Sequence, residues 1–137
     1  MDTGGTSDFR GQPHDALFRR VLGRPEHAGS ELRSILPAEV VSRIDLDSLS
    51  LQPGTFVDDH LRHRHTDLLF QATIDDRDGY LYVLLEHQRT PDPLMAYRML
   101  GYQAQIWSRH LSEAAKAGEP EPRSLPVVIP IVIYQGE

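Results

Sequence analysis

Two runs of alternating apolar residues, separated by a short polar stretch, constrain the fold of this chain more than any other feature. The runs cover residues 66–74 and 80–88. Their period of two is typical of half-buried strands. The stretch between them, residues 75–79, is polar and ends in Gly79, which favours a turn. The sequence therefore predicts an antiparallel β-hairpin.

The alternation also predicts a pairing for the two strands. In an antiparallel pair, the residue numbers of opposed residues always add to the same sum. The two apolar faces lie on the same side of the sheet only if this sum is odd, and placing Ile74 opposite Gly79 meets this condition. Asp67 then lies directly across from Glu86, with Cβ atoms about 4.5–5.5 Å apart. Carboxylates this close repel unless a cation bridges them, and Mg²⁺ is often held by one or two carboxylates. A cation held in this way suits phosphodiester hydrolysis. In that reaction Gln88, which lies on the same face, is predicted to hold the attacking water or a phosphate oxygen.

A further signal comes from short segments spread along the whole chain. They are PHDALF at residues 13–18, FVD at 56–58 followed by TDLLF at 66–70, LLEHQ at 84–88, and PVVIPIVIYQGE at 126–137. In this order they resemble the Rpn, or YhgA-like "putative transposase", family, a branch of the PD-(D/E)XK nuclease superfamily. The resemblance rests on the ordered set and not on any single segment.

The resemblance implies a set of site residues. Asp67 matches the family's aspartate, and Glu86-x-Gln88 matches its (D/E)-x-K-like element, so Asp67 and Glu86 are the expected metal ligands and Mg²⁺, or Mn²⁺ in its place, is the expected cofactor. Gln88 stands where the generic motif has lysine, as in the Rpn pattern. An amide orients water but brings no positive charge to the transition state. Asp15 matches an acidic position near the start of the family and is a candidate accessory ligand through water, with helix capping as the alternative.

The charge of the chain has to be reconciled with a DNA substrate. The net charge is −6, whereas contacts to phosphates normally come from Lys and Arg. The basic residues nevertheless flank the predicted site: Arg62 and Arg64 precede Asp67, and Arg89 follows Gln88. We expect these arginines to contact the DNA backbone, and a solvated charged surface is the alternative for each of them.

Helices are predicted on both sides of the hairpin. Apolar spacing favours helices over Pro13–Leu22, Pro25–Ile35 and Ala38–Ile44, followed by a strand around Leu49–Gln52. After the hairpin, Asp92 is expected to cap a helix that has Pro93 at its first position and continues toward Ala117. We expect this helix to pack on the sheet through a stripe of residues at helical spacing, namely Tyr97, Leu100, Ala104, Trp107 and Leu111.

The last predicted element is a strand over Leu125–Tyr134, whose β-branched run favours burial on both faces. Pro126 and Pro130 must then lie at a bulge or on an unpaired side. The resulting order, helix, three strands, helix and strand, is the α-β-β-β-α-β core of the resembled superfamily. We therefore predict an α/β fold of the restriction-endonuclease-like (PD-(D/E)XK) type, with a mixed sheet flanked by helices.

Composition sets the remaining limits. The chain has no cysteine, which excludes disulfides and a thiol nucleophile, and no apolar run approaches the ~20 residues of a membrane span. The start lacks the features of a signal peptide, so we expect a cytoplasmic protein with no membrane partner. Residues 1–12 are predicted to be a disordered tail. Residues 13–137 are predicted to form one nuclease/transposase domain, truncated at the C-terminus because the resembled family continues further.

The predicted function is that of a Mg²⁺-dependent DNA endonuclease linked to recombination or mobile elements, with a homo-oligomer left open. A non-catalytic DNA-binding or protein-interaction module with the same fold is the alternative. A zinc hydrolase using His60, His63 and His65 is disfavoured because the chain lacks an HExxH motif. His87 is expected on the apolar face of its strand, as a core or rim histidine.

Overall fold

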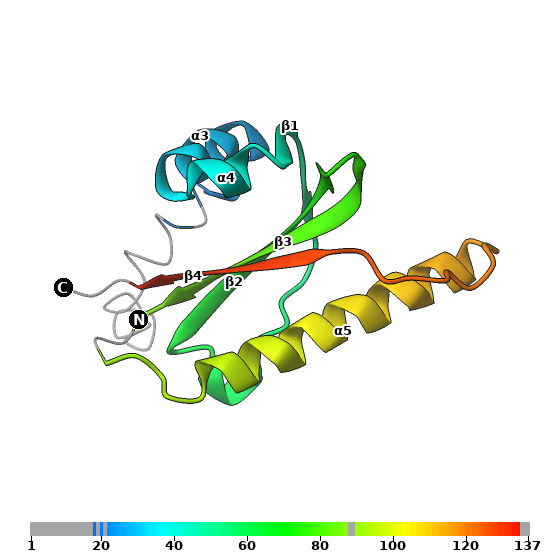
Figure 1. Ribbon diagram of the computed structural model, residues 1–137. Helices are drawn as coiled ribbons and strands as arrows, with labels where there is room; N and C mark the ends of the chain where they lie inside the picture. Colours follow the sequence, from blue (N-terminus) through cyan, green and yellow to red (C-terminus); the bar gives the residue numbers. More distant parts are fainter. Residues whose placement is uncertain (1–17, 19, 21, 88–89, 135–137) are drawn as a thin grey trace, which may run out of the picture.

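The computed structural model describes residues 18, 20, 22–87 and 90–134, and these form a mixed sheet between helices (Figure 1). The sheet order is β1-β2-β3-β4, in which β1, β2 and β3 are antiparallel neighbours and β4 runs parallel to β3. The elements are α3 (Pro25–Ile35), α4 (Ala38–Val41), β1 (Ile44–Gln52), the 3₁₀ turn η2 (Asp59–Leu61), β2 (His65–Ile74), β3 (Arg77–Glu86), α5 (Met95–Lys116) and β4 (Val128–Tyr134). The predicted α/β class and the element order are confirmed.

Each face of the sheet carries its own hydrophobic core. On one face, Phe70 and Val83 pack in a cluster with Leu32 of α3. On the other face, Tyr82 and Leu84 pack with Met99, Tyr102 and Ile106 of α5. Figure 1 shows α3 and α4 on one side of the sheet and α5 on the other. Because both faces are covered, side chains on either face of β2 and β3 are removed from water.

The hairpin is confirmed, but its predicted register is wrong by two residues. Ile74 pairs with Arg77, and the turn consists of Asp75 and Asp76, which have φ values of 51° and 65°. Positive φ at both central residues is the mark of a type I′ turn, whose twist suits a two-residue hairpin. The hydrophobic pattern fixes only which face each residue joins, and a shift by two leaves that unchanged. The tighter turn adds ladder pairs, and it sets Asp67 across from Leu84 instead of Glu86.

The helix after the hairpin begins later than predicted. Asp92 does not cap a helix that has Pro93 at its first position: α5 starts at Met95, with Leu94 as its N-cap. The Asp92 carboxylate instead accepts a hydrogen bond of 2.8 Å from the Leu94 amide, and the Asp92 carbonyl accepts one of 3.1 Å from the Met95 amide. A local turn at Asp92 therefore precedes the helix.

The predicted core stripe of this helix is also wrong. Tyr97 and Leu100 are 71% and 63% exposed, and Ala104 is exposed as well. Trp107 is half-buried and its indole N–H donates to the Pro126 carbonyl at 2.7 Å. The residues of α5 that face the sheet are Met95, Met99, Tyr102 and Ile106. Both sets recur at spacings of three and four, so periodicity alone does not select the buried one.

The other boundaries differ in smaller ways. Pro25–Ile35 is helical as predicted, but the next helix ends at Val41, and β1 begins at Ile44 instead of near Leu49. A register shift between Asp45 and Ser50 interrupts the pairing of β1 with β2, which hides the alternation of this strand in the sequence. The predicted first helix and the N-terminal tail lie mostly outside the described residues.

The last strand lies at the edge of the sheet, and the predicted burial on both faces holds in part: Val128 is buried in the cluster with α5 and Ile131 in the cluster with α3, while the other residues are only partly buried or exposed. It starts at Val128, and its buried residues are Val128 and Ile131. The Val127 carbonyl accepts a hydrogen bond of 2.9 Å from the Tyr80 amide. Alternate residues of a strand turn their backbone groups to the same side, so the ring nitrogen of Pro130 faces away from β3, on the unpaired side as expected.

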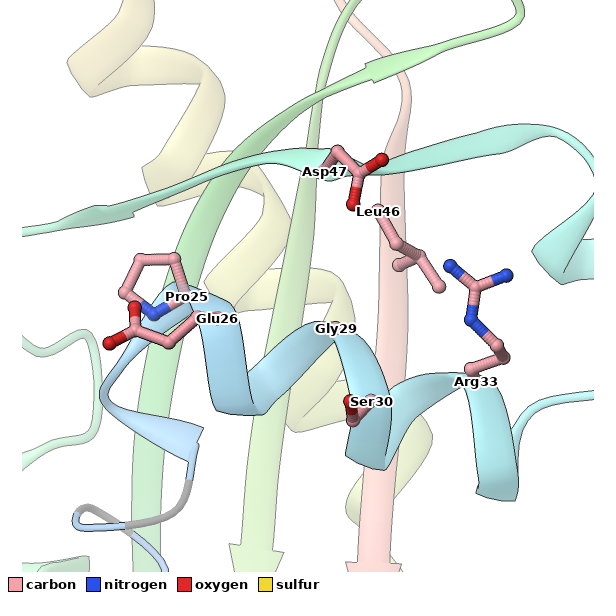
Figure 2. Close-up of a pocket in the computed structure, with 7 residues that line it drawn as sticks. All are labelled: Pro25, Glu26, Gly29, Ser30, Arg33, Leu46 and Asp47. Atoms are coloured by element: carbon pink, nitrogen blue, oxygen red, sulfur yellow. The ribbon is translucent and has the colours of Figure 1, made fainter.

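Among the described residues, no helix is both long and apolar enough to cross a membrane. A shallow hollow lies where α3 crosses β1 (Figure 2). Gly29 allows this close crossing, since a Cβ atom there would lie 3.2 Å from the Leu46 carbonyl oxygen. The polar residues that line the hollow are Glu26, Ser30, Arg33 and Asp47.

Candidate functional site

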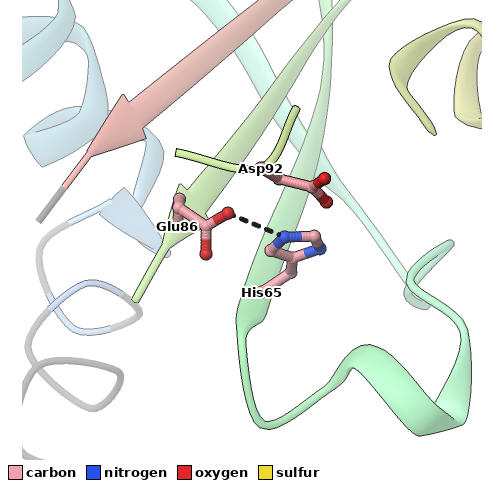
Figure 3. A group of neighbouring side chains, drawn as sticks. All are labelled: His65, Glu86 and Asp92. Atoms are coloured by element: carbon pink, nitrogen blue, oxygen red, sulfur yellow. Dashed lines mark hydrogen bonds and ion pairs between the residues drawn. The ribbon is translucent and has the colours of Figure 1, made fainter. Parts of the chain in front are cut away.

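Three buried ionisable side chains gather where β2 begins, β3 ends and the chain turns toward α5 (Figure 3). They are His65, Glu86 and Asp92, here called the His65–Glu86–Asp92 cluster. Each offers one atom that can bind a metal, and these atoms all lie within 4.8 Å of one another. The exposed fractions of the three residues are 2%, 0% and 6%.

The contact between His65 and Glu86 follows directly from the strand register. The two residues are paired in β2 and β3, so their side chains leave the sheet at the same point of the same face. His65 Nε2 lies 3.1 Å from Glu86 Oε2. Among the described residues, no hydrogen-bond partner is found for the buried Nδ1 atom of His65. The imidazole ring thus keeps one ring nitrogen with unused bonding capacity.

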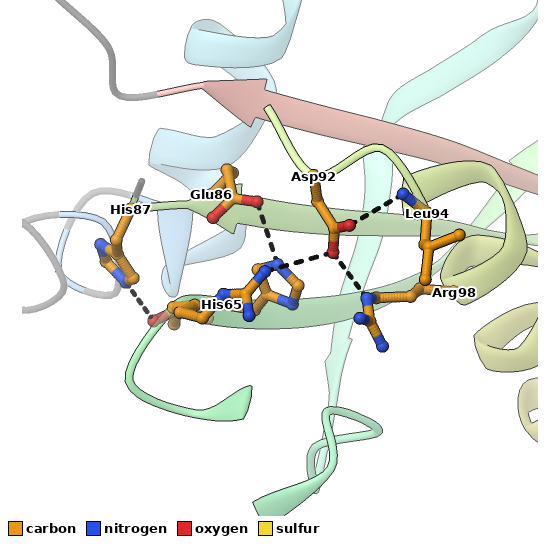
Figure 4. A network of polar contacts seen from close by, with 8 residues as sticks. His65, Glu86, His87, Asp92, Leu94 and Arg98 are labelled. Atoms are coloured by element: carbon orange, nitrogen blue, oxygen red, sulfur yellow. Dashed lines mark hydrogen bonds and ion pairs between the residues drawn. The ribbon is translucent and has the colours of Figure 1, made fainter. Parts of the chain in front are cut away.

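Asp92 connects the cluster to α5 and to the residue before β2 (Figure 4). Its Oδ2 atom accepts a hydrogen bond of 2.6 Å from Arg98 Nε and lies 3.5 Å from Arg64 Nη2. Burial acts to raise the pKa of Asp92, but the Leu94 amide and the Arg98 guanidinium outweigh it, so the pKa lies below its ordinary value. Asp92 is therefore held as a carboxylate beside the His65–Glu86 pair.

Asp67 lies on the same sheet face as Glu86 but outside the cluster. Its carboxylate accepts hydrogen bonds from the Thr55 hydroxyl, from the Phe56 amide at 2.8 Å and from the Tyr82 hydroxyl at 2.7 Å. Burial, and then the nearby Asp67 carboxylate, raise the pKa of Tyr82, which keeps its hydroxyl protonated as a donor. Asp67 thus ties the loop before η2 to the central strands.

The remaining predicted site residues fall into two groups. Arg64 reaches the cluster through Asp92, whereas Arg62 is exposed and pairs with Asp59 at 3.0 Å. The predicted roles of Gln88, Arg89 and Asp15 concern residues outside the described ones. His87 is half-buried, and its Nε2 atom lies 2.8 Å from the Thr66 hydroxyl, which agrees with the predicted rim histidine.

Sequence reasoning missed His65, Asp92 and Arg98 as parts of the site. The position of His65 could have been predicted, because it lies two residues before Asp67 in the same strand and therefore on the same strand face. The zinc interpretation grouped it with His60 and His63, but both of these are exposed and outside the cluster. No comparable signal in the sequence marks Asp92, because it reaches the cluster through the turn before α5 and not through the hairpin.

The residues present fit a divalent cation. The cluster offers two carboxylates and one imidazole, which together suit a hard or borderline metal ion. It is shielded from water, and the buried Nδ1 atom of His65 shows that its donors are not all used within the described residues. A metal-binding role is thus chemically consistent with the donors, their burial and their spacing.

The comparisons with known proteins give the family. The family model described as "Putative transposase, YhgA-like" matches residues 12–137. The chain is 39% identical to recombination-promoting nuclease RpnD of Escherichia coli O157:H7, over 90% of this chain and 45% of RpnD. It is also 39% identical to recombination-promoting nuclease RpnC of E. coli K12, over 91% of this chain and 39% of RpnC.

A third relative differs in its name. The inactive recombination-promoting nuclease-like protein RpnE of E. coli K12 is 31% identical over 96% of this chain and 42% of RpnE. The chain thus spans less than half the length of each of these three relatives. No solved structure matches the chain. With the family model covering almost the whole sequence, the chain belongs to the YhgA-like putative transposase family, whose relatives include the Rpn recombination-promoting nucleases.

Proposed function

We propose that this protein is a Mg²⁺-dependent DNA endonuclease linked to recombination or mobile elements. The observation that carries the proposal is the burial of Glu86, the family's expected metal ligand, in a convergent group of metal-binding side chains. The names of its relatives, recombination-promoting nucleases, support DNA as the substrate. The element order supports a fold of the PD-(D/E)XK type.

In this proposal the metal ligands are Glu86 and Asp67. The two residues are not opposed, but they share a sheet face and lie two residue pairs apart along the ladder, with the Thr66–Leu85 pair between them. The three hydrogen bonds to Asp67 fix its carboxylate, and since a carboxylate has about four lone-pair sites it keeps capacity for a cation. A bound divalent ion lowers the pKa of its water and neutralises charge on the scissile phosphate.

The other proposed roles belong to polar side chains near the metal. Gln88 follows Glu86 by two residues and holds the attacking water, while Asp15 is an accessory ligand through water. Arg64, with Arg62 and Arg89, contacts the DNA backbone. Arg64 is favourably placed among these, because its side chain is 25% exposed and lies beside Asp92 of the cluster.

A non-catalytic DNA-binding or protein-interaction module is the second candidate function. It is favoured by the name of RpnE, which marks a relative as inactive, and by Gln88 in place of a lysine. It is also favoured by the arginines around Asp92, which balance part of the negative charge without a metal. Such a module keeps the fold and the DNA contacts but does not hydrolyse phosphodiester bonds.

A plasmid-nicking assay separates the two functions. The wild-type chain is incubated with supercoiled DNA, with Mg²⁺ and with EDTA, beside the variants Glu86→Gln and Asp67→Ala. A matched control is Glu113→Gln, since Glu113 lies on α5 with a side chain that is 60% exposed. We expect metal-dependent nicking by the wild type and by Glu113→Gln but not by the site variants. Wild-type DNA binding without nicking in any divalent metal would favour the non-catalytic module.

A further inference from the structure

We propose that His65 and Asp92 join Glu86 as ligands of a first-row transition-metal ion, so that this site binds Mn²⁺ and Co²⁺ more tightly than Mg²⁺. The inference deepens the proposed function by naming the class of metal that the same site prefers. The ligands added here, His65 and Asp92, are not among those implied by the family motif.

The spacing of the donors is the first support. His65 Nε2 and Glu86 Oε2 are 3.1 Å apart, which suits two neighbouring ligands of one ion, because metal–nitrogen and metal–oxygen bonds are about 2.0–2.2 Å long. A ligand atom of Asp92 lies within 4.8 Å of the other two. The β2–β3 pairing fixes His65 against Glu86, and the turn before α5 brings Asp92 to them.

The unused ring nitrogen of His65 is a second and independent support. His65 is 2% exposed, and its Nδ1 atom has no hydrogen-bond partner within the described part of the chain. Buried polar atoms almost always bind something. Figure 3 shows the Glu86 and Asp92 side chains gathered at the imidazole ring, with Glu86 joined to one ring nitrogen. In histidine–metal sites one ring nitrogen binds the ion and a second group orients the other, so a ring with Nε2 beside Glu86 keeps Nδ1 available for such a contact.

Charge also favours a cation here. Within the described residues, the two arginines that reach the cluster, Arg64 and Arg98, both contact the same carboxylate, that of Asp92. Among the described residues, Asp92 Oδ1 accepts a hydrogen bond from the Leu94 amide and keeps further acceptor capacity. A divalent cation at the cluster is therefore attracted by the buried Glu86 and Asp92 carboxylates.

The imidazole decides the preference among metals. Mg²⁺ favours oxygen ligands and a near-ideal octahedron that retains several waters. Imidazole nitrogen binds later transition metals better, and affinity for a given mixed site rises from Mn²⁺ to Co²⁺. The proposal therefore predicts a specific order of affinity, in which Co²⁺ binds most tightly and Mg²⁺ most weakly, and it predicts that the order depends on His65.

Isothermal titration calorimetry with the chloride salts of Mg²⁺, Mn²⁺ and Co²⁺ tests this order. We expect His65→Gln to weaken Mn²⁺ and Co²⁺ binding at least about tenfold and Mg²⁺ binding less, because ligand-shell changes typically cost 10–100-fold in affinity. The matched control is His63→Gln, since His63 is exposed, two residues away, and outside the cluster. Equal affinities for Mg²⁺ and Mn²⁺ that His65→Gln leaves unchanged would overturn the proposal.

A measurement on the wild-type chain avoids the risk that His65→Gln fails to fold. Pulsed electron paramagnetic resonance of bound Mn²⁺ detects a coordinated imidazole through its nitrogen coupling. We expect this coupling in the wild type and in His63→Gln. Tight Mn²⁺ binding without nitrogen coupling would refute the histidine ligand. If Mg²⁺-dependent nicking persisted in that case, the proposed nuclease function would still stand. Nitrogen coupling without nicking would refute the nuclease function and support the histidine ligand.

Discussion

His65 and Glu86 face each other across β2 and β3, with Nε2 and Oε2 3.1 Å apart and both side chains fully buried. A pair of this kind places a nitrogen and an oxygen donor on a rigid part of the sheet, where neither can move without disturbing the strand ladder. Their separation is therefore set by the backbone and not by loop conformation. This rigidity is what a metal site requires of its supporting strands.

The first prediction concerns metal binding by Glu86. Glu86→Gln should abolish Mn²⁺ and Mg²⁺ binding in calorimetry, because an amide is a much poorer ligand for these ions than a carboxylate. Metal that binds only the folded chain should stabilise the wild type by about 2.7 kcal/mol at 100 times its dissociation constant. The variant should lose this stabilisation in thermal unfolding, while Glu113→Gln should keep it. Undiminished binding by Glu86→Gln would exclude Glu86 as a ligand.

The second prediction concerns the structural role of Asp67. In the wild type the Phe56 amide and the Tyr82 hydroxyl donate to one carboxylate oxygen and the Thr55 hydroxyl donates to the other. Asp67→Asn keeps one acceptor oxygen, forces the Thr55 hydroxyl to turn and accept from the new NH₂ group, and removes the charge that strengthens all three hydrogen bonds. We expect a loss of about 1–3 kcal/mol in the free energy of unfolding by urea. Asp59→Asn is the control, since the Asp59 side chain is 91% exposed. Equal stability of wild type and Asp67→Asn would contradict this network.

Asp67 and Glu86 also show which features of the hairpin can be predicted from the sequence. The period of two places Asp67 and Glu86 on one face of a hairpin, and both are on that face in the structure. The same period does not set the register, because a shift by two residues keeps every side chain on its face. The turn selects the register of the two strands. Asp75 and Asp76 adopt positive φ, so the hairpin closes at these two residues and not at Gly79. Local turn chemistry thus decides which residue faces Glu86.

The N-terminal end of α5 shows a second limit of sequence reasoning. Asp92 and Pro93 carry the signals of a capped helix, but the Asp92 carboxylate is shared between the Leu94 amide and the two arginines. Arg64 comes from a segment 28 residues earlier in the chain. Long-range partners of this kind leave no mark in the local pattern. The sequence could therefore predict that a helix follows the hairpin but not where it starts, nor which of its faces meets the sheet.

The third prediction tests the turn. Asp76 has a φ of 65°, in the left-handed region where glycine has no steric cost. Asp76→Gly should therefore stabilise the chain by about 0.5–1 kcal/mol in urea unfolding, because the left-handed strain that it relieves exceeds the conformational entropy that glycine adds to the unfolded chain. Asp78→Gly is the matched contrast: Asp78 is paired with Thr73 inside the ladder, and glycine there should destabilise by a similar amount. Stabilisation by both substitutions, or by neither, would be inconsistent with a turn at Asp75 and Asp76.

The fourth prediction concerns acid stability. The pKa of Asp92 is lowered, so its carboxylate stabilises the fold fully above the unfolded-state value of about 3.9 and loses this effect as the pH falls through the lower folded-state value. Asp92→Asn should thus reduce stability at neutral pH and flatten the fall in stability below about pH 4. Arg98→Met should also destabilise at neutral pH, by about 1.5–3 kcal/mol, the usual range for a hydrogen bond to a charged group.

Chemical denaturation measured between pH 2.5 and pH 7 distinguishes these outcomes from a general loss of packing. The informative quantity is the difference in unfolding free energy between Asp92→Asn and wild type at each pH. This difference should shrink as the pH falls through the window below about pH 4. A difference that stays constant over the whole range would mean that the ionised Asp92 carboxylate contributes nothing through Arg98, Arg64 and the Leu94 amide.

The last prediction separates nucleophile positioning from metal binding at Gln88. Gln88→Ala should lower the rate of Mg²⁺-dependent plasmid nicking about 100-fold while the affinity for Mn²⁺ changes little, because a group that orients the attacking water acts on turnover and not on ground-state binding. Gln88→Lys restores the generic motif, adds positive charge near the reacting phosphate, and should retain activity or increase it. Single-turnover nicking rates and calorimetry on the same preparations give the two quantities. A wild-type rate in Gln88→Ala would remove Gln88 from the mechanism, and a parallel loss of metal affinity would make it a ligand instead.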